Sequence, residues 1–438
     1  MEELLEPEIA TPSGASLLIS PFARLFKQNL SRNFWVFFTV AFFFDFGFAV
    51  YFFLFNLYLL DLHFNERTIG LVGGALAFGS VIGTLPAGWL ARKTGLRPLM
   101  AICLIAAPAL GVVRALVTGE WAQIASAFLA GLAMCIWGVT FLPAVASLTT
   151  EENRASAFSL IFSVGIGASA FGSVVCGYLP QWLMAAGFTL QGVDVKRTIL
   201  ITSCCIALLG ILPLLSLRLP PPVLEPQARD KTSRKPWRIN AFLLVFLPCM
   251  AIWTAAQASF TPFASVYLAR GLEIQMPQIG LILSASQLVQ LGAGLLTPLV
   301  FRRLGLVNGI VATQIATAAT LACLTGASNK GMAVLVFLSF FAAQWMSSPG
   351  IYNLLMSKIP EQERSSASAM TLFSNAVLGS FATAGAGMLF AQFGYPRVLA
   401  GISTLALIAA LLFKFLVTPA VRTQGNPLEP TPLRFPHS

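Results

Sequence analysis

Twelve long apolar runs follow one another along the sequence, separated by short polar segments. Each has about the 20 residues that an α-helix needs to cross roughly 30 Å of hydrocarbon. Because the runs are continuously apolar and do not alternate in short segments, they predict helices and exclude a membrane β-barrel. We therefore expect an all-α membrane protein with 12 transmembrane helices. The runs are 33–60, 68–91, 98–117, 121–148, 155–179, 198–217, 239–267, 278–300, 305–325, 331–358, 365–390 and 396–417.

The composition supports a membrane protein and excludes several classes of function. Of 438 residues, 57% are hydrophobic and 10% are charged, whereas about a quarter of the residues of soluble proteins are charged. The opening MEELLEPEIA is acidic, so we expect no cleavable signal peptide. All seven cysteines fall inside the apolar runs without metal-binding spacing, and no nucleotide-binding or hydrolase motif occurs. We therefore expect no metal site, no cofactor and no enzymatic activity.

The basic residues predict how the chain is oriented. If the first run starts in the cytoplasm, cytoplasmic segments hold 20 of the 27 Lys and Arg residues, as the positive-inside rule requires. Both termini are then cytoplasmic. The net charge of +10 is explained by this topology and by contact with anionic membrane lipids, so nucleic acid is not needed as a partner. The compact loops favour the inner (plasma) membrane of a bacterium, and we expect a monomer.

A shift of 210 residues brings the two halves of the sequence into register. TIGL at 68–71 meets QIGL at 278–281, LARKTGL at 90–96 meets VFRRLGL at 300–306, and EENRASA at 151–157 meets EQERSSA at 361–367. Basic clusters and a glutamate-arginine loop at one constant shift predict an internal duplication, hence two pseudo-symmetric six-helix bundles. The expected parts are a cytoplasmic segment at 1–31 with a short interfacial helix at 20–30, bundles at 32–217 and 239–418, a linker at 218–238 and a cytoplasmic tail at 419–438.

Two six-helix halves, a basic central loop and the segment GWLARKTGLR resemble the major facilitator superfamily. The family's loop after its second helix reads G-x-x-x-D-R/K-x-G-R/K-R/K, and this chain matches it at Gly88, Lys93, Gly95 and Arg97, with Arg92 in place of the aspartate. The resemblance implies a secondary transporter whose halves rock around a central cavity. A receptor or regulator that has lost transport is the alternative from another class.

The resemblance also implies that helices 1, 4, 7 and 10 line the cavity. Asp45 and Asn56 lie on one stripe of the first helix, and a charge in mid-membrane is functional by default. The alternative is a structural hydrogen bond from a neutral Asp45. The expected substrate or cavity residues are Asp45, Asn56, Trp137, Gln257, Gln287, Gln344, Trp345 and Tyr352. Arg114, near the end of the third helix, is interpreted as a snorkelling interfacial arginine.

The expected substrate is a small organic solute. Export of amphipathic or cationic compounds is the leading class, because one carboxylate among aromatic rings attracts a lipophilic cation. Uptake of a polar solute such as a sugar is the close alternative, and a lipid flippase is a third. Asp45 is the candidate for coupling to protons.

Charged loops predict a cytoplasmic gate. Arg92 is expected to contact Glu361 or Glu363, and Arg302 is expected to contact Glu151 or Glu152 of the other half. The alternative is that all these side chains are exposed to water and only set the orientation of the chain in the membrane. The gate set is Arg92, Gly95, Glu151, Glu152, Arg154, Arg302, Gly305, Glu361, Glu363 and Arg364.

Overall fold

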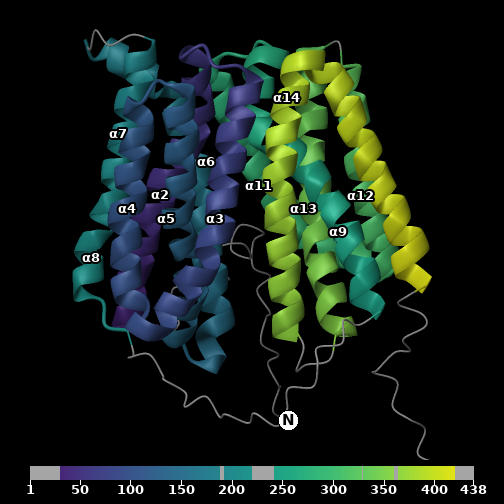
Figure 1. Ribbon diagram of the computed structural model, residues 1–438, viewed down its shortest axis with the longest axis horizontal. Coiled ribbons are helices and arrows are strands. Elements are labelled where there is room, and N and C mark those ends of the chain that lie inside the picture. The colour runs from purple at the N-terminus through teal and green to yellow at the C-terminus, as the bar shows by residue number, and fades with distance from the viewer. Residues whose placement is uncertain (1–29, 188–191, 220–240, 328, 360–363, 420–438) are drawn as a thin grey trace, which may run out of the picture.

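The computed structural model describes residues 30–187, 192–219, 241–327, 329–359 and 364–419, nearly all of them helical. In Figure 1 the long helices run side by side in one common direction. The predicted segments 1–31, 218–238 and 419–438 fall almost entirely outside the described residues. The elements are α2 (Arg32–Asp61), α3 (Glu66–Thr94), α4 (Leu96–Leu116), α5 (Glu120–Ser147), α6 (Glu151–Ala185), α7 (Val193–Leu209), α8 (Ile211–Ser216), α9 (Ala241–Phe260), η1 (Thr261–Phe263), α10 (Ala264–Val266), η2 (Tyr267–Gly271), α11 (Met276–Leu304), α12 (Leu306–Thr325), α13 (Lys330–Lys358), α14 (Arg364–Leu412) and η4 (Phe413–Val417).

Eleven helices in the described part of the chain are long and apolar enough to cross a membrane. The last of them spans 48 residues, Met370–Val417, about twice the length that one crossing needs. It consists of two helices that meet at Gly394, whose φ of 74° is not helical. The predicted runs 365–390 and 396–417 therefore lie in the two arms of this element, which meet at the top of Figure 1.

Glycines with left-handed backbone angles turn the chain between two pairs of helices. Gly95 joins α3 to α4 with φ 88°, and Gly305 joins α11 to α12 with φ 80°. Residues with a Cβ rarely adopt such angles. The 210-residue shift pairs these two glycines, so the repeat in the sequence extends to the backbone conformation of the loops.

The predicted run 239–267 is not one continuous helix. The α-helix α9 ends at Phe260, and the chain continues through the 3₁₀ turn η1, the short α10 and the π-helical turn η2. Pro262 lies in this irregular stretch and has no N–H to donate to a continuing helix. Its carbonyl accepts a hydrogen bond of 2.8 Å from Asn56 Nδ2 on α2.

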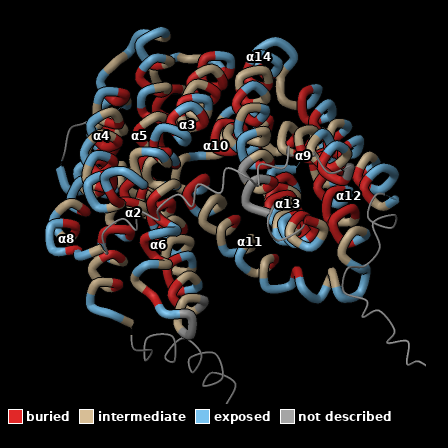
Figure 2. The backbone as a smooth tube through the Cα atoms, turned by 60° about the horizontal axis from the view of Figure 1, so that its bottom comes forward, coloured by how far each residue is buried: buried red, intermediate tan, exposed pale blue. Residues whose placement is uncertain are grey.

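The helices form two groups. In the first, α2 packs against α6 and α7, and α3 packs against α5; in the second, α9 packs against α14, and α13 packs against α11 and α12. The groups lie on the left and right of Figure 1 and meet where α3 contacts α14 and α6 contacts α11. Buried positions lie mainly where helices face one another, and exposed positions mark the outer surface (Figure 2).

Candidate functional site

Two close glycine contacts join the two groups of helices. A Cβ added at Gly70 of α3 would lie 2.8 Å from Gly387 Cα of α14, and one added at Gly280 of α11 would lie 3.2 Å from Gly177 Cα of α6. The 210-residue shift converts Gly70 into Gly280 and Gly177 into Gly387, so the same contact is made twice. We call the end of the molecule where these contacts lie the glycine end.

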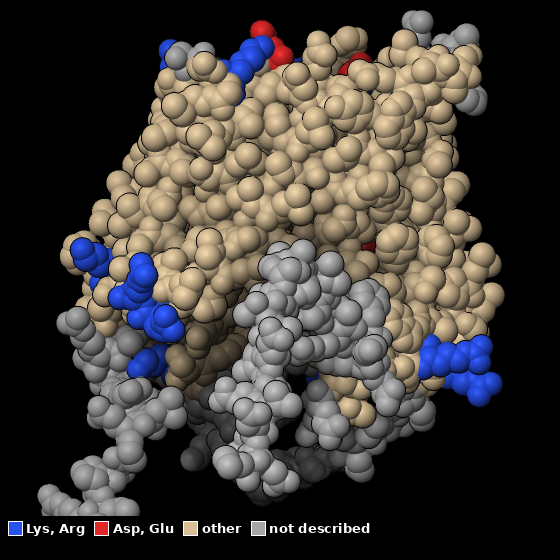
Figure 3. Space-filling view, turned by 180° about the vertical axis from the view of Figure 1, so that it is seen from behind, with Lys and Arg blue, Asp and Glu red and all other residues tan. Residues whose placement is uncertain are grey.

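The opposite end carries many of the basic side chains. We call it the arginine end, after Arg92 and Arg302, which are exposed near the ends of α3 and α11. Added Cβ atoms at Gly88 and Gly292, further along the same two helices toward this end, would meet no described residue within 4 Å. Figure 3 shows Lys and Arg side chains (blue) at the lower end of the molecule, and Asp and Glu side chains (red) together with further Lys and Arg at the upper end.

A buried carboxylate reinforces the glycine end. Arg270 Nη1 donates to both oxygens of Glu66 at 3.2 Å, and Tyr395 OH donates to Glu66 Oε1 at 3.0 Å. Glu66 is 7% exposed and starts α3, where the positive end of the helix dipole stabilises an anion. Arg270 and Tyr395 belong to the second group of helices. This cluster therefore ties the two groups together at the glycine end.

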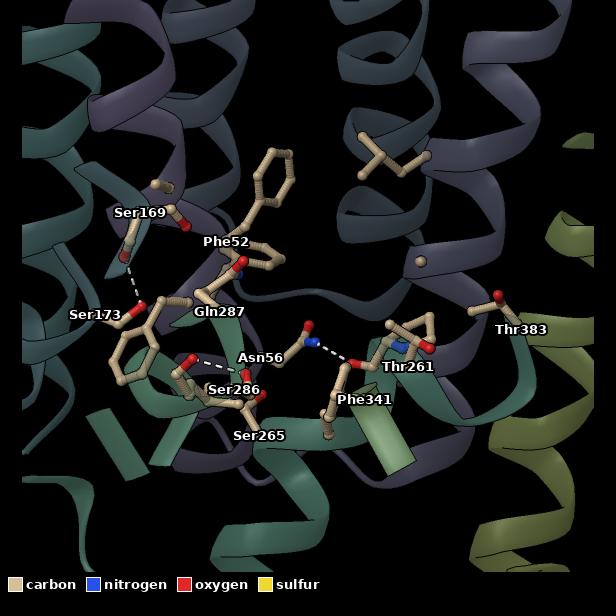
Figure 4. A pocket seen from close by; sticks show the side chains of 18 of the residues that line it. Phe52, Asn56, Ser169, Ser173, Thr261, Ser265, Ser286, Gln287, Phe341 and Thr383 are labelled. Carbon is tan, nitrogen blue, oxygen red and sulfur yellow. Dashed lines mark hydrogen bonds between the residues drawn. The ribbon is translucent and has the colours of Figure 1, made fainter. Parts of the chain in front are cut away.

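A cavity of about 570 Å³ lies between the two groups. Figure 4 shows its labelled hydroxyl and amide side chains around one space, with Asn56, Ser169 and Ser173 from the first group and Ser286, Gln287 and Thr383 from the second. Phe52 and Phe341 add apolar wall. The size and the mixture of apolar wall with a few polar groups are typical of sites for small organic molecules.

Asp45 lines a second cavity of about 650 Å³. Its Oδ1 accepts a hydrogen bond of 3.1 Å from Trp137 Nε1 on α5, and most of the other lining residues are apolar. The two cavities share Ala49, Phe52, Ser169 and Gln287, so they adjoin. Asp45, Asn56, Trp137 and Gln287 thus lie around one pair of cavities.

The other predicted cavity residues lie outside these two walls. Gln344 Oε1 accepts a hydrogen bond of 3.4 Å from Thr261 Oγ1, and Gln344 Nε2 donates one of 3.2 Å to the same hydroxyl. Gln344 therefore contacts Thr261, which lines the 570 Å³ cavity. Gln257 is half-buried on α9 but is not part of either wall. Trp345 and Tyr352 are each 45% exposed on α13. The structure does not bring these four side chains into the space around Asp45.

Those predicted gate residues that the structure describes lie near the arginine end. Glu361 and Glu363 are outside the described residues, as are the side chains of Glu151, Glu152 and Arg364. Arg92 and Arg302 are exposed, and Arg154 is half-buried. Gly95 and Gly305 form the turns described above. The crossed contacts proposed for this end therefore stay a prediction.

The interpretation of Arg114 as an interfacial arginine is wrong. Its side chain does not reach a membrane surface: the residue is 3% exposed and forms part of the wall of the 570 Å³ cavity. Its guanidinium lies 4.0 Å from the ring centre of Phe55 and 5.9 Å from that of Tyr51. Its place near the C-terminal end of α4 suggested snorkelling, but the residues of α2 cover it.

Comparison with known proteins agrees with a transporter fold. The chain is similar to a solved structure of the nucleoside transporter NupG, with 14% identity and a TM-score of 0.68, over 88% of this chain and 98% of that chain. It is also similar to the xylose transporter XylE from E. coli, with 15% identity and a TM-score of 0.68, over 87% of this chain and 95% of that chain. A bacterial homolog of the human lysosomal transporter Spinster, in an inward-facing and unoccupied conformation, is similar with 13% identity and a TM-score of 0.70, over 90% of this chain and 99% of that chain. No curated protein sequence matches the chain.

The two helical groups with a cavity between them correspond to the fold of these solved structures. The family model of the Major Facilitator Superfamily matches residues 37–384, most of the chain. The chain therefore belongs to the Major Facilitator Superfamily and is a transporter in family and fold, not an enzyme.

Proposed function

We propose that this protein is a secondary active transporter that moves a small organic solute across the membrane by alternating access. The observation that carries the proposal is the 570 Å³ cavity, whose wall takes residues from both groups of helices. The described hydrogen bonds between the groups, from Arg270 to Glu66 and Phe64 O, from Tyr395 to Glu66 and from Asn56 to Pro262, lie toward the glycine end. This arrangement corresponds to the state that is closed at the glycine end.

The same proposal includes the finer topology expected from the sequence. Twelve transmembrane helices form two pseudo-symmetric six-helix bundles, with the two arms of α14 as the last two crossings. The arginine end faces the cytoplasm because basic residues are retained there, so both termini are cytoplasmic. We place the monomer in the inner membrane of a bacterium, with its basic residues against anionic lipid.

The cavity supports a polar solute better than an amphipathic cation. Hydroxyl and amide groups, together with the guanidinium of Arg114, form the polar part of the 570 Å³ wall, and Asp45 already accepts a hydrogen bond from Trp137. We therefore assign Asp45 to proton coupling and place the solute beside Asn56 and Gln287. Gln344 acts through Thr261. When the glycine end opens, Arg92 and Arg302 pair with the acidic loops to close the cytoplasmic side.

Chemical labelling from each side of the membrane tests this proposal. Ser169→Cys places a thiol in the wall shared by both cavities, in a background where the exposed Cys205 and Cys323 are replaced by serine. We expect an impermeant maleimide to react quickly from the cytoplasmic side and slowly from the other side. Equal rates from both sides, or no reaction from either, would contradict a cavity that opens to one side at a time.

Glu66→Gln is expected to speed labelling of Ser169→Cys from the outer side by roughly 2- to 5-fold. The substitution removes the charge that Arg270 binds, and Arg270 is 41% exposed at its side chain, so the lost interaction is worth about 1 kcal/mol or less. Asp194→Asn is the matched control, because it removes an ion pair with Arg197 inside the first group of helices. If both variants change the rate equally, the Glu66 cluster does not hold the glycine end closed.

A further inference from the structure

Arg114 is a buried cation without an acidic partner among the residues that the structure describes. It is 3% exposed, and its Nε is buried without a hydrogen-bond partner. The ion pairs among the described residues are Lys196 with Asp61, Arg197 with Asp194 and Arg270 with Glu66, and none of them includes Arg114. A guanidinium carries five N–H donors and no acceptor, and leaving a buried charge unpaired is costly.

Stacking on aromatic rings does not meet this requirement. Phe55, with its ring centre 4.0 Å from the guanidinium carbon, and Tyr51, at 5.9 Å, attract the cation. The N–H donors, however, point outward in the guanidinium plane, so contact with a ring does not supply them with acceptors. The rings hold the side chain in place, while its hydrogen-bonding capacity stays available to a ligand.

The surroundings of Arg114 indicate where that ligand lies. Arg114 forms part of the 570 Å³ cavity wall and is its one charged residue among those the structure describes. The same wall offers the hydroxyls of Ser265 and Ser286 and the amides of Asn56 and Gln290. An oxyanion matches the planar fork of a guanidinium and accepts two parallel hydrogen bonds from it.

We propose that Arg114 binds an oxyanion of the transported solute, and that the solute is a small organic anion with a carboxylate or phosphate group. The proposal rests on the transport function proposed above and names its substrate class. It excludes the cationic class expected from the sequence, because a cation in this cavity would meet an unpaired guanidinium. The polar groups of the wall bind the uncharged part of the same solute.

The anion site is separate from Asp45. Arg114 packs on Phe55, which lies about ten residues beyond Asp45 on α2, and the helical rise makes that about 15 Å along the helix. One small solute does not reach both groups. A proton on Asp45 and an anion at Arg114 therefore occupy different sites, and one proton together with a monoanion carries no net charge through the protein.

Binding to the purified full-length protein tests this assignment. The probes share one skeleton within each set: glucuronate, glucose 6-phosphate, glucose and glucosamine, then benzoate, phenyl phosphate, benzyl alcohol and benzylammonium. Thermal shift at millimolar concentration identifies binders, and calorimetry measures their affinity. We expect the anion of at least one set to bind more tightly than its neutral and cationic counterparts, and the two anions of that set distinguish carboxylate from phosphate.

Three variants connect this preference to Arg114. Arg114→Gln should weaken binding of the anion by about 10- to 100-fold, the usual loss for hydrogen bonds to a charged group, and leave binding of the neutral probe unchanged. Arg114→Lys keeps the charge and should restore part of the affinity. Arg67→Gln, which removes an exposed arginine at the start of α3, should have no effect. A merely structural role for Arg114 would instead weaken all probes alike.

Several results would overturn the assignment: no anion binds, a neutral or cationic probe binds as well as the anion, or Arg114→Gln keeps the anion affinity. These results are independent of the labelling test of Ser169→Cys. If one-sided access is found but anions are not preferred, the protein alternates and the substrate class is wrong. If the anion binds through Arg114 but access never alternates, the site is correct and transport is wrong.

Discussion

Gly387→Ala is expected to drive the protein out of the state that is closed at the glycine end. The new methyl group would press on the backbone of α3, against Glu66 O and 2.8 Å from Gly70 Cα. The backbone of α3 cannot move away from this methyl group unless the whole helix moves. The overpacking should therefore destabilise the closed state, and only that state, by about 1–3 kcal/mol. The populations should then shift by roughly 5- to 150-fold toward the outward-open state. Faster labelling of Ser169→Cys from the outer side measures the shift.

Gly385→Ala is the control for this prediction. It lies two positions away on α14, and its added Cβ would meet nothing within 4 Å, so outer-side labelling should stay at the wild-type rate. The repeat offers a second test: Gly280→Ala would place its methyl 2.5 Å from Ser173 O, whereas Gly292→Ala on the same helix would meet nothing. Equal effects of crowded and uncrowded positions would show that helix propensity, not contact between the halves, causes the change.

Asp45→Asn is expected to abolish proton-driven accumulation while leaving exchange of solute intact. A neutral amide keeps the shape of the side chain and its contact with Trp137, but it neither takes up nor releases a proton. With one proton per solute anion, a gradient of one pH unit supports about tenfold accumulation in the wild type, and the variant should show none. Proteoliposomes and the radiolabelled anion that binds most tightly provide the measurement.

Asp61→Asn is the matched control for Asp45. It changes a carboxylate on the same helix that is 30% exposed and pairs with Lys196 at 2.8 Å, so accumulation should persist. If Asp45→Asn still concentrates the anion from a pH gradient, protons are coupled elsewhere or not at all. Loss of exchange as well as accumulation, in a folded variant, would mean that Asp45 contributes to solute binding.

Those features that depend on short stretches of sequence were predictable. The length and apolar character of the runs indicated the helices, and the 210-residue repeat paired Gly95 with Gly305, which adopt the same left-handed turn. Asp45 and Asn56 lie at the cavities because helical spacing sets which residues share a stripe. The glycines at 70, 177, 280 and 387 stood in the repeat as well, although their role as paired contacts needed three-dimensional structure.

The interactions between distant helices were not predictable. Glu66, Arg270 and Tyr395 come together from positions far apart in the chain, and each alone resembles a polar residue at the end of a run. Gln257 has helical spacing that suits a cavity, but the packing of α9 against α14 decides its direction. For Arg114, closeness to the helix end suggested exposure at a membrane surface, whereas the packing of α2 against it buries the side chain.

Paired distance measurements at the two ends of the same protein test alternating access most directly. Spin labels at Thr94 and Leu304, which the repeat pairs, report the arginine end, and labels at Thr118 and Gly326 report the glycine end; all four residues are exposed. Alternating access predicts opposite changes: in Gly387→Ala the first pair shortens while the second lengthens, and in Gly385→Ala both keep their wild-type distances. If the two distances change in the same direction, or the glycine end opens while the arginine end keeps its spacing, the two halves do not rock around a central site.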